Sequence, residues 1–344
     1  MPDPFIIAEI AQGHEGKPAQ AAALVAAAAA AGADAAKLQL VYADELASPD
    51  YEHFALFRGL EMPDQAWRDL ADLARDRKLQ LQLDIFGSRS LALAESIGAH
   101  AVKIHGTDMS NPGLLEQVGR SRVPEVLLSA GGCLDVEIER ALDRLPGKRL
   151  VLLHGFQGYP TRVEANQILR LREFARRYGK REQLRLGFAD HADPDSAKSV
   201  LLPAAALGAG ATVIEKHLTL AKALKLEDHE SALNPDEFAT FVNQMRECYS
   251  ALSCGAGGES GPTSGSADFG MHESERRYRD KTRKHVVAAR DLAAGSLIGA
   301  ADVTLKRTAS TVFLQDTGAV VGRRLTRAAR TDEAIRSDMI EEAR

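Results

Sequence analysis

The chain has 344 residues, of which 45% are hydrophobic and 26% are charged, and its formal net charge is −5. This is the composition of an ordinary globular protein, and the length suffices for one large domain and one small one. The sequence contains no basic block, so nucleic acid is not an expected partner.

The cysteines and the N-terminal segment indicate where the protein works. Cys133, Cys248 and Cys254 have no spacing typical of a disulfide framework or a metal knuckle, which favours a reducing compartment. Residues 1–16 lack the basic segment and long apolar core of a signal peptide. The alanine-rich run at 19–36 predicts a packed surface helix, because alanine is a strong helix former and only weakly hydrophobic. We therefore expect a cytoplasmic protein without a membrane partner.

A repeated pattern organises the first part of the chain, in which a short apolar run ends in polar residues and a helical segment follows. The runs lie at 5–10, 35–40, 79–86, 100–105, 125–131, 149–156, 184–191 and 212–218. Alternating strands and helices predict a parallel sheet. Eight units within about 250 residues predict an α/β fold, a closed (β/α)8 TIM barrel over residues 1–253. An open doubly wound sheet is the alternative, but no Gly-x-Gly-x-x-Gly follows the first run.

The composition changes after residue 253. Residues 254–270 are rich in glycine and serine and predict a flexible linker. Residues 271–344 show short β-like runs and turn signals, which predict a small β-rich second domain. A domain of this size folds alone only marginally.

Polar residues gather at the carboxyl ends of the predicted strands, where the active site of a barrel lies. The strand ends carry Glu9, Lys37, Gln39, Asp84, Lys103, His105, Ser129, His154, Asp190, His191, Glu215 and His217. Side chains alternate along a strand, so Glu215 and His217 share one side and Lys216 takes the other. A lone buried histidine is more often structural than functional, but ionisable residues at so many strand ends indicate one functional cavity.

Two pairs within this set suggest specific chemistry. His191 and His217 end neighbouring strands, and two imidazoles completed by water suit a divalent transition metal such as Mn²⁺, Co²⁺ or Zn²⁺; two structural core histidines fit the spacing equally well. Lys37 and Lys103 lie among apolar neighbours, and buried lysines are rare unless paired. They either pair with Glu9 and Asp84 or bind an anionic substrate, and we favour the anionic substrate.

Several motifs resemble those of the N-acetylneuraminate (sialic acid) synthase family over nearly the whole chain. "FIIAEIAQGHEG" resembles the first strand of the family, and "LLHGFQGYPT" its sixth. "ADHAD" and "GATVIEKHLTL" resemble its two metal-histidine motifs. The tail "VVAARDLAAGSLIGAADVTLKR" resembles its C-terminal antifreeze-like (SAF) domain.

The resemblance implies an activity. The family condenses phosphoenolpyruvate with an open-chain N-acyl hexosamine, such as N-acetylmannosamine, and releases a nonulosonic acid and phosphate. His191 and His217 would hold the divalent metal, Mn²⁺ first and Co²⁺, Mg²⁺ or Zn²⁺ as alternatives, which polarises the sugar aldehyde. Glu9 would be the third catalytic residue and would handle protons near the attacking water.

The resemblance also implies a substrate site, whose predicted residues are Lys37, Gln39, Asp84, Lys103, Ser129, Tyr159, Asp228 and Arg307. Lys37, Lys103 and Ser129 match positions that hold the phosphate and carboxylate of phosphoenolpyruvate. Tyr159 and Asp228 match sugar-contacting positions. Arg307 matches a tail arginine that reaches into the barrel of the partner chain in a domain-swapped homodimer.

The chain departs from the family pattern where the donor phosphate binds. Asp84 replaces a threonine, and a carboxylate repels a phosphate unless a cation lies between them. "KIHGTD" replaces Lys-Ile-Gly-Ser-Gly-Glu, Gln157 replaces an asparagine and Ala189 a serine. Two alternatives follow: a sugar-binding or regulatory protein that has lost phosphoenolpyruvate binding, and a metal-dependent aldolase or isomerase acting on a sugar acid.

Overall fold

Eight parallel strands close into a barrel in the computed structural model, which describes residues 3–155, 158–196, 200–253, 271, 273–309, 314 and 316–341. The barrel closes because β1 (Phe5–Ala11) pairs with both β2 (Ala35–Gln39) and β8 (Val213–Leu218). The strands between them follow chain order and are β3 (Gln80–Ile85), β4 (Ala101–Ile104), β5 (Glu125–Ser129), β6 (Arg149–Gly155) and β7 (Leu184–Asp190). The predicted TIM barrel is confirmed, and the open doubly wound sheet is wrong.

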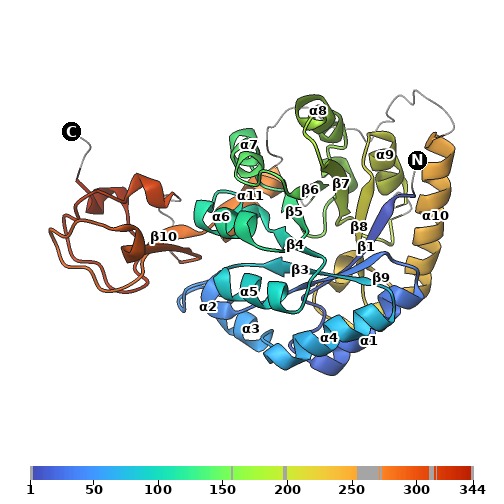
Figure 1. The fold of residues 1–344 in the computed structure, drawn as a ribbon, viewed down its shortest axis with the longest axis horizontal. Coiled ribbons are helices and arrows are strands. Elements are labelled where there is room, and N and C mark those ends of the chain that lie inside the picture. The colour runs from blue at the N-terminus through green and yellow to red at the C-terminus, as the bar shows by residue number, and fades with distance from the viewer. Residues whose placement is uncertain are drawn as a thin grey trace.

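Helices surround the barrel on its outside (Figure 1). The longer ones are α1 (Pro18–Ala30), α4 (Asp64–Asp76), α5 (Ser88–Ser96), α6 (Pro112–Arg120), α7 (Asp135–Asp143), α8 (Leu169–Tyr178), α9 (Leu201–Gly208) and α10 (Pro235–Ser253). The alanine-rich run is α1, which buries Ala21, Leu24, Val25 and Ala28 at helical spacing. In the described ranges, we find no helix whose length and apolar character would let it cross a membrane.

The inside of the barrel changes from apolar to charged along its axis. An apolar layer is formed by Ile7, Ala35, Ala101, Leu127, Val151, Leu153 and Val213. Two residues further along the same inner faces lie Glu9, Lys37, Lys103 and Glu215. The period of two along each strand therefore places charged groups directly above an apolar floor.

The C-terminal tail stands to one side of the barrel (Figure 1). Helix α11 (Glu273–Thr282) leads to the antiparallel strands β10 (His285–Ala288) and β11 (Val303–Lys306). The tail has an apolar core of its own, which includes Val286, Leu305 and Ile335. Gln157, Cys254 and the predicted linker 254–270 lie outside the described residues, so the domain boundaries at 253 and 271 stay predictions.

Candidate functional site

A cavity of about 310 Å³ opens at the carboxyl ends of the barrel strands. Of the catalytic and substrate-binding residues that the family resemblance implies, all except Lys37 line it: Glu9, Gln39, Asp84, Lys103, Ser129, Tyr159, His191, His217, Asp228 and Arg307. Lys37 lies beneath the cavity and is completely buried. The barrel thus brings together side chains that are up to about 300 positions apart in the sequence, as the rule for parallel strand ends predicts.

Five charged side chains form a buried cluster at the cavity floor, which we call the axial cluster: Glu9, Lys37, Asp84, Lys103 and Glu215. The Lys37 ammonium contacts the Glu9 carboxylate and lies 2.9 Å from Asp84 Oδ1 and 3.5 Å from Glu215 Oε2. Lys103 Nζ lies 3.2 Å from Glu215 Oε1, 3.5 Å from Asp84 Oδ2 and 3.7 Å from Glu9 Oε2. The structure therefore shows the ion pairs that the sequence left as the alternative to anion binding.

The axial cluster holds three carboxylates and only two ammonium groups. Burial raises the pKa of Glu9, and the charges of Glu215 and Asp84 raise it further, while Lys37 opposes them. Burial alone would also raise the pKa of Glu215, but Lys103 and Lys37 hold it below its usual value. Because a charge that is buried without a partner is costly, one carboxyl favours its protonated form. Glu9 is the cluster member best suited to hold that proton.

The end of β1 fixes the Glu9 side chain. The pairing of β1 with β2 shifts between Glu9 and Ala11, and Ala11 has a φ of 47°. This bulge turns the Ala11 amide so that it donates a hydrogen bond of 2.8 Å to Glu9 Oε1. One carboxylate oxygen is thus held by the backbone, while the other faces Lys37.

His191 and His217 lie next to each other, with ring centroids 5.0 Å apart. Burial lowers the pKa of His191 to about 3, and burial together with the neighbouring His191 lowers the pKa of His217 well below its usual value, so both rings are neutral at physiological pH. His191 Nδ1 lies 3.0 Å from the Ala189 carbonyl, which orients the ring.

The two rings fit a metal ion. His217 Nδ1 is buried and has no hydrogen-bond partner among the described residues. A neutral imidazole with a free ring nitrogen is a metal ligand. No third His, Cys, Asp or Glu joins the pair within the described ranges, so water or substrate would complete the coordination.

Hydrogen bonds on both sides of the sheet hold the backbone around His191. The His191 carbonyl accepts hydrogen bonds from the Thr161 amide, at 2.8 Å, and from Ser231 Oγ, at 2.7 Å. On the outer side, Lys216 Nζ lies 3.1 Å from Asp190 Oδ2 and donates to the Ala192 carbonyl at 2.9 Å. The expectation that Asp190 faces the cavity is therefore wrong, because Asp190 precedes His191 by one residue and points to the opposite face.

His154 also lies outside the cavity, contrary to expectation. Its ring packs against Phe174 and Phe188, and its Nε2 lies 2.7 Å from the Asn166 carbonyl. The neighbouring residue Leu153 takes the inward position and belongs to the apolar layer of the barrel. His154 is a satisfied core histidine between β6 and α8.

Tyr159 and Asp228 lie together at the cavity mouth. The Tyr159 hydroxyl donates to the Asp228 carbonyl, and the Gln12 amide donates to Asp228 Oδ2 at 3.1 Å. The Tyr159 ring lies edge-on to the rings of both cavity histidines, with centroids 6.2 Å from His191 and 5.9 Å from His217. Burial raises the pKa of Asp228 to about 6.

Arg307 reaches the cavity from the tail of the same chain. Its guanidinium carbon lies 5.4 Å from the Tyr51 ring centroid and 5.3 Å from that of Phe57, and its Nε donates to the Thr282 carbonyl at 3.0 Å. Its own carbonyl accepts a bond of 2.9 Å from the Ser48 amide. A single chain therefore already places this arginine at its own barrel, and the swapped dimer stays a prediction.

Helix α11 covers part of the cavity, a feature that the pattern of strand ends in the sequence does not predict. Tyr278, Lys281 and Thr282 of this helix line the cavity. One turn before Tyr278, Glu275 accepts a bond of 2.8 Å from the Gly132 amide and pairs with Arg170 at 3.4 Å. No spacing along the barrel strands signals these residues, because they come from the segment that follows the predicted linker.

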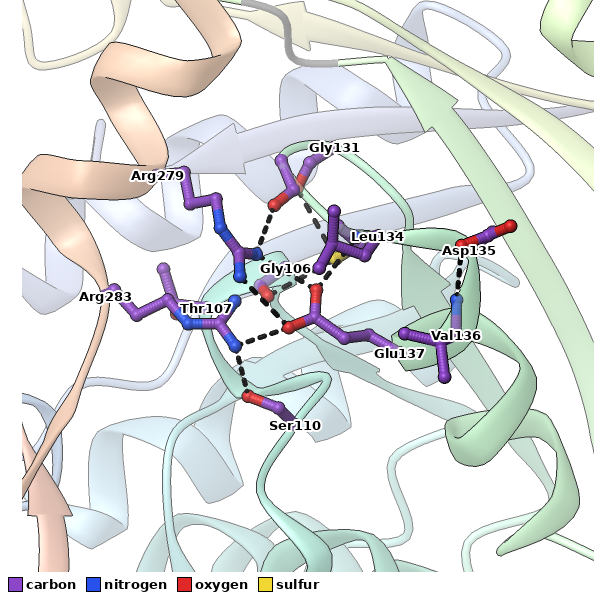
Figure 2. A network of polar contacts seen from close by, with 12 residues as sticks. Gly106, Thr107, Ser110, Gly131, Leu134, Asp135, Val136, Glu137, Arg279 and Arg283 are labelled. Atoms are coloured by element: carbon purple, nitrogen blue, oxygen red, sulfur yellow. Dashed lines mark hydrogen bonds and ion pairs between the residues drawn. The ribbon is translucent and has the colours of Figure 1, made fainter. Parts of the chain in front are cut away.

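A second group of ion pairs holds α11 on α7. Glu137 lies between Arg279 of α11 and Arg283, the residue that directly follows this helix (Figure 2). Arg279 Nη1 lies 2.9 Å from Glu137 Oε2 and donates to the Gly132 carbonyl at 2.9 Å, and Arg283 Nη2 donates to Ser110 Oγ at 2.8 Å. Removing one partner of a buried pair is strongly destabilising, so Glu137 fixes where Tyr278 and Thr282 lie.

Comparison with known proteins agrees with this architecture. The NeuB family model matches residues 24–257, and the SAF domain model matches residues 283–341. The chain is 27% identical over 343 residues to N,N'-diacetyllegionaminic acid synthase of Legionella pneumophila, which covers 94% of this chain and 90% of that protein. These matches confirm the family resemblance drawn from the motifs.

A second relative is similar in both sequence and solved structure, and a third is similar in structure. The chain is 32% identical over 265 residues to spore coat polysaccharide biosynthesis protein SpsE of Bacillus subtilis, covering 73% of this chain and 69% of that protein. The crystal structure of SpsE superposes with a TM-score of 0.85 at 27% identity, over 99% of this chain and 96% of the other. N-acetylneuraminic acid synthetase of Leptospira borgpetersenii superposes with a TM-score of 0.68 at 25% identity, over 81% and 92%.

The buried histidine between β6 and α8 predicts a pH dependence of stability. Burial lowers the pKa of His154 from 6.5 to about 3, so the unfolded chain binds a proton below pH 6.5 that the folded chain does not. Stability is thus lost as the pH falls from 6.5 towards 3. His154→Gln, which keeps a side-chain donor for the Asn166 carbonyl, should reduce the loss between pH 8 and pH 5 by about 2 kcal/mol. Denaturant unfolding of both chains at the two pH values measures this difference, and equal losses would contradict it.

Proposed function

Because this chain belongs to the NeuB family, we propose that it is a nonulosonic acid synthase, which condenses phosphoenolpyruvate with an open-chain N-acyl hexosamine and releases phosphate. The observation that carries the proposal is one cavity in which two neutral histidines lie beside a buried carboxylate–lysine cluster. The names of the relatives support the class of product, since they are synthases of legionaminic and N-acetylneuraminic acids.

Within this proposal the cavity residues have separate tasks. His191 and His217 would hold a divalent metal, Mn²⁺ first and Co²⁺, Mg²⁺ or Zn²⁺ as alternatives, which would supply Lewis acidity towards a carbonyl oxygen. Glu9, whose pKa burial raises, exchanges a proton with the water that attacks the enol carbon. Tyr159 and Asp228 meet the sugar at the mouth of the cavity.

The remaining polar residues orient the anionic groups. Lys103 and Ser129 line the cavity wall above Lys37 and face the donor. Arg307 presents a planar guanidinium, which suits a carboxylate because two parallel N–H groups bind its two oxygens. Gln39 accepts a bond of 3.0 Å from Gln12 Nε2 and lies beside the sugar-facing wall.

The charge of the axial cluster favours a second candidate function. Lys37 and Lys103 already pair with three carboxylates, so neither of these two lysines is left unpaired for an entering phosphate. A metal-dependent aldolase acting on a sugar acid, or a sugar-binding regulatory protein, uses the histidines and Tyr159 without a phosphate donor. Asp84 supplies the third carboxylate, so replacing it distinguishes the synthase from the second candidate.

A homodimer with exchanged tails is part of the proposal. Residues 254–270 connect the barrel to the tail, and 17 residues span at most about 60 Å when extended. This reach serves either the barrel of the same chain or that of a partner. In the exchanged dimer, α11 and Arg307 would make with the barrel of the partner the contacts that they make here with their own.

The proposed reaction has a direct test. The purified, Mn²⁺-loaded protein is mixed with phosphoenolpyruvate and a panel of N-acyl hexosamines, and released phosphate and sugar acid are measured. We expect equal amounts of both products with at least one sugar. Binding of a sugar without phosphate release would contradict the synthase and support the second candidate.

The metal site predicts a selective loss. His217→Ala removes one of two imidazole ligands, so purified protein should lose most of its bound divalent metal. His105→Ala is the matched control, because His105 lines the same cavity but lies outside the histidine pair. Metal analysis of both variants should show loss only in the first. Stoichiometric metal in His217→Ala would refute the assignment.

Asp84 predicts a change in donor affinity. Asp84→Thr removes one of three carboxylates from the axial cluster and leaves two lysines facing two carboxylates. If the donor is phosphoenolpyruvate, its KM should fall about tenfold, which corresponds to one like-charge contact of about 1.4 kcal/mol. Asp84→Glu keeps the charge and serves as the control. A loss of activity without a fall in KM would show that Asp84 binds a hydroxyl or amine of another substrate.

A further inference from the structure

A second cavity of about 320 Å³ lies between the barrel and the tail and shares no lining residue with the first. We call it the α7–α11 cleft, because α7, α11 and the residues that directly follow these helices supply most of its charged side chains. These are Glu137, Arg140, Arg144, Arg279 and Arg283, and Asp316 comes from the tail. Apolar side chains complete the wall, among them Met109, Leu115 and Leu314. The volume lies in the range of small-molecule sites.

The cleft has more positive than negative charge. Its four arginines face two carboxylates, Glu137 and Asp316. Glu137 is shared by Arg279 and Arg283 (Figure 2), and Asp316 Oδ1 accepts a bond of 2.8 Å from the Gly318 amide. The lining therefore has a formal excess of two positive charges, which a dianion would balance.

Two of the arginines form no ion pair in the part of the chain that is described. Arg140 and Arg144 are exposed and lie four positions apart at the end of α7. Like charges at this spacing destabilise a helix, whereas the helix dipole favours cations at its C-terminus. The dipole accounts for the basic residues at the end of α7, but it does not account for Arg283, which follows the facing helix α11.

Arg283 has an unsatisfied donor. Its side chain is 6% exposed, and its Nη2 binds Glu137 and Ser110. Its Nε–H is buried and has no acceptor among the residues that the structure places. A buried donor without a partner costs about 1–3 kcal/mol. An acceptor oxygen on a ligand would remove this cost.

We propose that the α7–α11 cleft binds a phosphate group, with Arg140, Arg144 and Arg283 as its ligands. Guanidinium groups bind phosphate oxygens through paired N–H donors, which ammonium groups cannot do. The apolar wall of Met109, Leu115 and Leu314 suits the organic part of a phosphate monoester. Free phosphate carries the same anionic group and is the other candidate ligand.

A phosphate bound in the α7–α11 cleft would also affect the first cavity, because of where the cleft lies. Arg140 and Arg144 belong to the barrel, and Arg283 belongs to the segment that leads to the tail. A bound phosphate therefore ties α11 to α7. Tyr278 and Thr282 of the same helix line the first cavity, so the two cavities are coupled through α11.

Calorimetric titration at fixed ionic strength tests the site, with phenyl phosphate and inorganic phosphate as the probes. The test variant is Arg140→Gln/Arg144→Gln, whose residues are exposed and lie outside the proposed active site. The matched control is Arg172→Gln/Arg176→Gln, which removes two exposed arginines at the same spacing from α8. None of these measurements depends on turnover, so their outcome is separate from that of the proposed synthase.

We expect the test variant to bind phenyl phosphate at least about tenfold more weakly than the wild type and the control, since a charged hydrogen bond contributes about 1.5–3 kcal/mol. Tighter binding of phenyl phosphate than of inorganic phosphate, lost in the test variant, identifies a monoester site. Equal binding of both probes, lost in the test variant, identifies a site for free phosphate. Equal affinities in all three proteins, or no binding by the wild type, would overturn the proposal.

Discussion

The axial cluster is the constraint on which the barrel depends. Five charged side chains, one from each of five strands, lie buried on the inner face of the barrel above an apolar layer. Charges in such a place are tolerated only when they are paired. A shift of one residue in any of these strands would move its charged group to the outer face, among the apolar side chains of the helices. The pairing of Lys37 and Lys103 with three carboxylates therefore specifies the register of the barrel as well as its chemistry.

Strand β8 shows how one short segment serves both faces of the sheet. Glu215 points inward to the axial cluster, Lys216 points outward to Asp190, and His217 points inward to His191. Each of the three consecutive ionisable residues thus has a partner, and no two of them compete for the same one. The outward pair also holds the turn that carries His191, because Lys216 bonds to the carbonyl that follows it. The geometry of the two histidines is therefore supported from outside the barrel.

The sequence predicted the barrel and most of the cavity, because both follow from local rules. The period of two along a strand and the common end of parallel strands suffice to bring Glu9, Lys103 and His217 together. The same alternation places Asp190 on the outer face of β7, because His191 beside it points inward. The expectation that Asp190 faces the cavity therefore conflicts with the rule itself. His154 is different, since its side depends on the register of β6, in which Leu153 pairs with Gly187. Ion-pair distances below 4 Å also depend on packing that spacing along the chain does not reveal.

The tail was recognisable from the sequence, but its position over the barrel was not. That position rests on contacts between residues more than 100 positions apart, such as Glu137 with Arg279. The tail keeps its apolar residues in a core of its own, and α11 meets the barrel mainly through charged groups. An interface of this kind resembles a contact between separate proteins more than the interior of a domain. In the structure these ion pairs join α11 to the barrel of its own chain, and the proposed exchange of tails would require the same pairs to form with the barrel of a partner. Which barrel α11 meets would then depend on the length of residues 254–270, which sets the entropy of closing the chain on itself, and on the protein concentration.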